Sequence, residues 1–188
     1  MTKFLRFINY PGPDERKGSE GVVREKLVEL DSHDTFHEVK EKLLNAFGIT
    51  EADTFGKVYL QQAIEIRDLD SIQYKDKRFF GIGAFDEKDP IEAHFKRVPV
   101  LFLLYTTMKK TRRHVLHIDP AKKIESLEPR IKERFDILPD LDIRLVHQGF
   151  LMGKDKTLND FRHFDPAHSI KIIVDFLEQK EEVGLPLE

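Results

Sequence analysis

Residues 141–161, LDIRLVHQGFLMGKDKTLNDF, form the stretch of sequence that decides the fold. The first residues of this stretch alternate between polar and apolar side chains, which is typical of a half-buried β-strand. Gln148 and Gly149 then predict a turn into a second short strand. The segment Thr-Leu-Asn-Asp-Phe at 157–161 forms a corner after that strand. The stretch therefore predicts two short strands joined by a turn and followed by a corner.

This order of strand, glycine turn, strand and Thr-Leu-Asn-Asp-Phe corner resembles the middle of ubiquitin. Around it, alternating apolar residues predict a hairpin of strands at 98–105 and 114–118 and a last strand at 170–174. A helix is expected at 122–135, with a bend or a short first turn at Pro129. One apolar stripe faces inward from that helix: Ile124, Leu127, Ile131 and Phe135. The resemblance covers residues 98–176 and implies the β-β-α-β-β order of the β-grasp fold.

The first half matches the same plan less closely and is interpreted as a diverged ubiquitin-like unit. Strands are expected at 3–10 and 24–30, separated by a long loop at 11–21. Residues 34–43, DTFHEVKEKL, resemble the start of ubiquitin's helix, and Gly48 predicts its end. We place a third strand at 57–61, the corner at 68–72 and the last strand at 78–82. Residues 91–97 are expected to form a short helix between the two units.

The fold class predicted from these patterns is α+β, with two tandem ubiquitin-like β-grasp domains. The first domain is assigned to residues 1–88 and the second to 97–178, leaving 179–188 as a disordered tail. The expected connection is about a dozen residues long, so the two domains should lie close together in a restricted relative orientation.

Composition narrows the classes of function. The 188 residues carry a formal net charge of −3 and contain no cysteine. The small net charge predicts no general attraction to nucleic acid or to a membrane surface. The absence of cysteine excludes disulfides and thiolate chemistry in this sequence and suits a reducing intracellular compartment, cytoplasmic or nuclear. We also expect no membrane span, because no apolar run approaches the roughly 18 residues that a spanning helix needs.

The sequence predicts no catalytic residue, no cofactor and no metal site. It contains no P-loop, nucleophile elbow or dinucleotide-binding glycine loop. His33 and His37 lie at a predicted helix start, which Ser32 or Asp34 would cap, and they lack further ligands nearby. His114 and His117 lie three residues apart in a strand, so they should point to opposite faces and cannot share a metal.

Alternation in the second unit predicts a surface that could bind a partner. Ile143, Leu145, Ile170, Ile172 and Val174 should point inward, and the residues between them should point to solvent. The resemblance places the recognition patch of ubiquitin on that outer face. The predicted partner-binding residues are Met108, Arg144, Val146, Lys171 and Ile173. Two alternatives remain open, namely that these residues pack on the first unit or that they have no role.

The function that follows is a non-catalytic protein-interaction module of the ubiquitin pathway, and we predict a monomer. Residues 78–86 resemble part of the ubiquitin-like repeats found in ubiquitin-specific proteases, which implies a regulatory or recruitment segment. The alternative is a two-domain ubiquitin-like modifier. Conjugation of such a modifier needs a C-terminal Gly-Gly, whereas this sequence has Gly184-Leu185-Pro186, so the conjugation tail would be absent or unprocessed.

Overall fold

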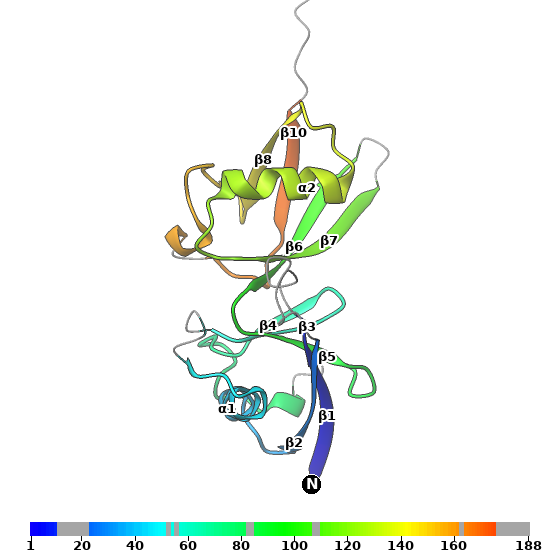
Figure 1. Cartoon of the computed structure of the whole chain (residues 1–188), viewed down its shortest axis with the longest axis vertical. Helices are drawn as coiled ribbons and strands as arrows, with labels where there is room; N and C mark the ends of the chain where they lie inside the picture. Colours follow the sequence, from blue (N-terminus) through cyan, green and yellow to red (C-terminus); the bar gives the residue numbers. More distant parts are fainter. Residues whose placement is uncertain are drawn as a thin grey trace, which may run out of the picture.

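The computed structural model describes residues 1–10, 23–51, 54, 57–81, 85–106, 110–161 and 164–175. In these ranges the chain forms two five-stranded sheets and two α-helices (Figure 1). The elements of the first half are β1 (Thr2–Asn9), β2 (Arg24–Asp31), α1 (Phe36–Phe47), β3 (Tyr59–Gln62), β4 (Glu65–Asp68), η3 (Phe79–Gly81) and β5 (Ile91–His94). The elements of the second half are β6 (Val98–Tyr105), β7 (Thr111–Ile118), η4 (Ile124–Leu127), α2 (Glu128–Phe135), β8 (Asp142–His147), β9 (Phe150–Leu151), η5 (Leu158–Asp160) and β10 (Ile170–Asp175). This arrangement agrees with the predicted α+β class.

The two sheets have the same strand order. The first is β2-β1-β5-β3-β4 and the second is β7-β6-β10-β8-β9. In each sheet the last strand lies in the centre, parallel to the first strand of the hairpin and antiparallel to the third strand. A helix packs on one face of each sheet, and the two halves are stacked along the long axis of the molecule (Figure 1). The chain therefore builds one arrangement twice.

The prediction for the second half is confirmed at its helix. The four residues of the apolar stripe, from Ile124 to Phe135, are all buried. A 3₁₀ turn over Ile124–Leu127 precedes α2, and Pro129 lies in the first turn of α2. A proline is tolerated there because the first N–H groups of a helix have no intrahelical partner. Asp136 ends the helix in the left-handed conformation (φ 53°) where glycine is usual, and its carboxylate accepts a hydrogen bond from Arg112 at 2.6 Å.

Three predictions for the first half are wrong. The last strand expected at 78–82 is not formed by residues 78–81, because Phe79–Gly81 is a 3₁₀ turn joined to the helix start by a bridge between Thr35 and Arg78, and residue 82 lies outside the described residues. That turn occupies the place in the first half that η5 occupies in the second, so the corner does not lie at 68–72. The last strand is β5, where a helix was expected. Ile91 and Ala93 anchor β5 by pointing into the first core. The predicted boundary at residue 88 thus falls before the strand that completes the first sheet.

The start of α1 also differs from expectation. Thr35, not Ser32 or Asp34, caps the helix, and its hydroxyl accepts from the backbone N–H of Glu38. The Glu38 carboxylate in turn accepts from the backbone N–H of Thr35 at 2.7 Å, which completes a capping box. This hydrogen bond lowers the pKa of Glu38. At the other end Gly48 adopts φ 65°, as the predicted helix end requires.

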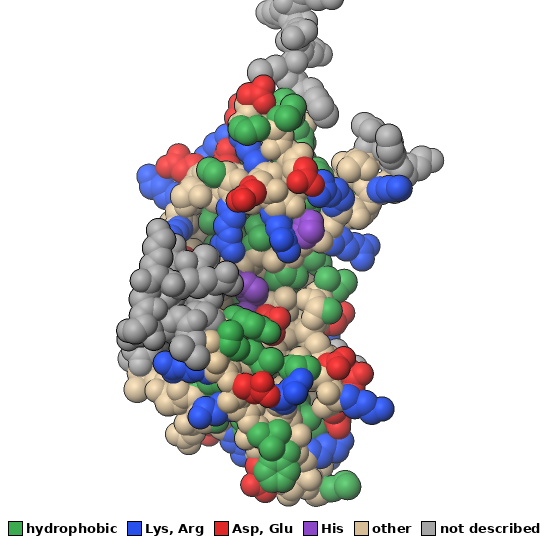
Figure 2. Space-filling model, turned by 45° about the vertical axis from the view of Figure 1, so that its right-hand side comes forward, with side chains coloured by type: hydrophobic (Ala, Val, Ile, Leu, Met, Phe, Trp, Pro, Cys, Tyr) green, Lys and Arg blue, Asp and Glu red, His purple; other side chains and the backbone are tan. Residues whose placement is uncertain are grey.

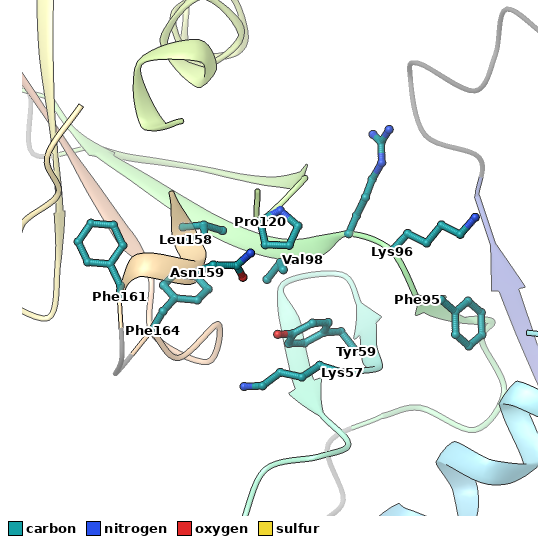
Figure 3. Close-up of a pocket in the computed structure, with 11 residues that line it drawn as sticks. Lys57, Tyr59, Phe95, Lys96, Val98, Pro120, Leu158, Asn159, Phe161 and Phe164 are labelled. Atoms are coloured by element: carbon teal, nitrogen blue, oxygen red, sulfur yellow. The ribbon is translucent and has the colours of Figure 1, made fainter. Parts of the chain in front are cut away.

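Tyr59 joins the two halves. It lies on β3 of the first sheet, yet its ring belongs to the hydrophobic core of the second half and is 5% exposed. In the close-up view the ring points toward Asn159 and Phe164, with Val98 and Pro120 beside them (Figure 3). Only residues 95–97 separate β5 from β6, and Phe95 is buried in the first core. The halves are therefore held close, as the short connection predicted.

Replacing Tyr59 by alanine should reduce the free energy of unfolding by about 3 kcal/mol, because it removes a ring that both halves enclose. Tyr59→Phe keeps the ring and should stay within about 1 kcal/mol of the wild type. Urea denaturation followed by circular dichroism measures both changes. An alanine variant with a wild-type unfolding curve would show that this contact does not join the halves.

Replacing Glu38 by glutamine should destabilise the protein at neutral pH and have no effect below the pKa of Glu38. A carboxylate whose pKa is lowered by folding stabilises the native state above its ordinary pKa, and that stabilisation disappears as the pH falls through the folded-state pKa. Thermal unfolding of both proteins across this pH range measures the difference. Glu133→Gln, at an exposed position of α2, is the control. A destabilisation by Glu38→Gln that is the same at all pH values would contradict this explanation.

Candidate protein-binding surface

The structure confirms the predicted faces of β8 and β10. Ile143, Leu145, Ile170 and Ile172 are at most 3% exposed and point into the second core. Arg144, Lys171 and Ile173 are exposed and Val146 is half-buried. Lys171 lies directly opposite Val146 across the two strands, and Ile173 lies opposite Arg144. Four of the five predicted partner-binding residues therefore share one face of the second sheet, whereas Met108 lies outside the described residues.

Two apolar residues that the prediction missed extend this surface. Leu151 on β9 pairs with Val146 and is 59% exposed. Tyr105, at the end of β6, is 57% exposed, and the Lys171 ammonium lies 5.9 Å from the centre of its ring. The alternation of β6 could have identified Tyr105, because Val100, Phe102 and Leu104 are its inward residues. We call Tyr105, Val146, Leu151, Lys171 and Ile173 the outer patch.

The two cations at the outer patch, Arg144 and Lys171, differ in whether a carboxylate of this chain already pairs with them. Arg144 donates to Asp175 at 2.6 Å, so its charge already has a partner. Among the residues that the structure describes, no carboxylate forms an ion pair with Lys171. Elsewhere the two signs of charge are interspersed on the face shown in Figure 2. Lys171 is thus the cation of this patch that a partner could neutralise.

The outer face of the first sheet is covered at one end by the second half, whereas the outer face of the second sheet is exposed. On the first sheet, Tyr59, Gln61 and His94 are each at most 6% exposed, because the second half packs over that end of the face. On the second sheet, Ile173 is 41% exposed. Packing between the halves therefore uses the outer face of the first sheet, and the outer patch stays accessible.

A polar cluster that the sequence did not predict lies where the halves meet. His117 on β7 stacks on His94 of β5, with ring centres 4.3 Å apart. Burial, followed by the nearby charges of His94, Arg130 and Arg97, lowers the pKa of His117 to about 3. His114 instead contacts Phe135 in the second half, so the two histidines of β7 do point to opposite faces, as predicted. No local signal could have found the pairing of His117 with His94, because the two residues lie on different sheets.

Comparison with protein-family models and with curated protein sequences found no match for this chain. No helix within the described ranges is long and apolar enough to span a membrane.

The alternation on β10 can be tested with neighbouring residues. Ile173→Asp should change the free energy of unfolding by less than about 1 kcal/mol, because residue 173 faces solvent. Ile172→Asp should cost more than about 4 kcal/mol or prevent folding, because it places a charge in the core. Thermal unfolding followed by circular dichroism separates the two outcomes. Equal destabilisation by both variants would disprove the assignment of the outer face.

Proposed function

We propose that this chain is a non-catalytic, intracellular protein-interaction module made of two ubiquitin-like β-grasp domains. In this proposal the outer patch of the second domain binds a protein of the ubiquitin pathway. The observation that carries the proposal is the group of exposed apolar side chains, Tyr105, Leu151 and Ile173, on one open sheet face.

The shared strand order supports the β-grasp assignment. Each half has a hairpin, a helix packed on one face and a last strand inserted in the centre parallel to the first strand. The 3₁₀ turn before the last strand occurs in both halves, at Phe79–Gly81 and at Leu158–Asp160. The resemblance of residues 141–161 to ubiquitin lies in the half with the open outer face.

The chemistry of the outer patch defines the partner that would fit it. Three large apolar side chains and the half-buried Val146 offer a surface that gains stability when water is removed. Lys171 lies opposite Val146 and two residues before Ile173 on β10, and its ammonium is 5.9 Å from the centre of the Tyr105 ring, so a carboxylate bound there would lie beside the apolar side chains of the patch. We therefore expect a partner segment that presents apolar side chains next to an aspartate or glutamate.

This proposal can be tested by affinity purification of the full chain from cells, followed by mass spectrometry. Ile173→Asp and Val146→Asp should lose the same partners, because each places a negative charge in the patch. Lys171→Glu should weaken binding of a purified partner by about tenfold or more, as measured by titration calorimetry.

Leu138→Asp is the matched control. Leu138 is also a large exposed apolar residue, 62% exposed, but it lies in the connection after α2 and outside the sheets. This variant should retain every partner. If Ile173→Asp and Val146→Asp also retain every partner while remaining folded, the outer patch is not the binding surface.

A further inference from the structure

The polar cluster at the junction of the halves brings metal-ligand side chains together from both sheets. Glu92 and His94 lie two residues apart on β5, so they share the outer face of the first sheet. Gln61 lies directly opposite Glu92 on β3 and adds its side chain to the same face. His117 reaches this group from β7 of the second sheet.

The donor atoms are spaced as ligands of one ion would be. The Oε2 atom of Glu92 is 3.2 Å from Nε2 of His94 and 3.8 Å from Nε2 of His117. One donor atom from each of these three residues lies within 4.8 Å of the others, a grouping found once in the described part of the chain. Nitrogen and oxygen ligands about 2.0–2.1 Å from a tetrahedral zinc lie about 3.4 Å apart. Small side-chain movements would therefore bring all three atoms to an ion.

Gln61 offers a fourth oxygen. Its Nε2 donates to the backbone carbonyl of Ala63 at 3.0 Å, which turns Oε1 toward the cluster. This oxygen lies 2.8 Å from Nε2 of His117. In the absence of a metal, Nε2–H of His117 can donate to that oxygen. A bound metal would take the Nε2 lone pair, so the neutral ring would carry its proton on Nδ1.

The surrounding charges explain why the carboxylate is needed. Arg130 donates to the backbone carbonyl of His117 at 2.8 Å, and Arg97 also lies near the ring. Both guanidinium groups would oppose a bound cation, and Glu92 is the group in the cluster that offsets this repulsion. Imidazole with carboxylate is a donor set suited to zinc.

We propose that Glu92, His94 and His117 form a binding site for a zinc-type divalent metal ion, completed by Gln61 or water, and that the ion ties the two halves together. Two ligands come from the first sheet and one from the second, so the ion would stabilise the junction and not either half alone. The proposal is independent of the outer patch and of any partner.

The test uses the full chain after treatment with a chelator. Titration with Zn²⁺, followed by calorimetry, should show one equivalent bound, and Zn²⁺ should raise the temperature of unfolding. Co²⁺ should give the visible absorption of a tetrahedral nitrogen and oxygen site. Glu92→Gln and His117→Gln should each weaken Zn²⁺ binding by about tenfold or more.

Surface histidines provide the controls. His37 pairs with Glu41 at 3.6 Å and His168 with Asp165 at 3.1 Å, so both are histidine–carboxylate pairs outside the cluster. His37→Gln and His168→Gln should leave the affinity unchanged. If these controls abolish binding, or if folded Glu92→Gln and His117→Gln proteins bind as the wild type does, the proposal is wrong.

NMR of the wild-type protein tests whether His94 and His117 bind Zn²⁺, even if a variant does not fold. Zn²⁺ should shift the imidazole resonances of His94 and His117 while leaving those of His37 unchanged. If Zn²⁺ leaves both resonances in place, the cluster only joins the halves by hydrogen bonding and stacking, and the metal site is disproved.

Discussion

The burial of Tyr59 in the core of the other half is the contact on which the rest of the structure depends. A tyrosine on the outer face of a sheet would ordinarily meet water. Here its ring lies among core residues of the second half, and this burial raises the pKa of the phenol. The contact covers one end of the first outer face and holds β7 close to β5, which places His117 on His94. Among the described residues, none makes a comparable contact with the second outer face, where Ile173 is 41% exposed.

The same capping device occurs once in each half, at the α-helix of the first half and at a 3₁₀ turn of the second. Thr35 and Glu38 form a capping box at α1, and Thr157 and Asp160 form the same device at η5. In the first half, Lys40 is buried at 3% exposure and forms ion pairs with Asp70 and Glu51. Burial alone would lower the pKa of Lys40, but the hydrogen bonds to both carboxylates outweigh it and raise the pKa. This lysine thus fastens α1 to the segment after β4.

The sequence predicted the second half well because its periodicities are local. Residues 141–161 specify strand, turn and corner without a gap, and alternation alone assigned the faces of β8 and β10. The first half misled the prediction because β5 offers only Ile91 and Ala93 as inward residues, after the charged segment 86–90. The apolar residues Phe79 and Phe80 led to the last strand being placed at 78–82. The cluster of Glu92, His94 and His117 could not be predicted from the sequence, because its residues lie on two sheets that are brought together by a contact that no local pattern encodes.

The passage from β5 to β6 has a mechanical consequence. The chain leaves the central strand of the first sheet and enters the strand beside the centre of the second, with Phe95 buried in the first core and Val98 in the second. Only Lys96 and Arg97 lie between these two anchors, too short a span to act as a hinge. A pulling force along the chain would pass straight from one sheet to the next. A partner bound to the outer patch would therefore also fix the orientation of the first half.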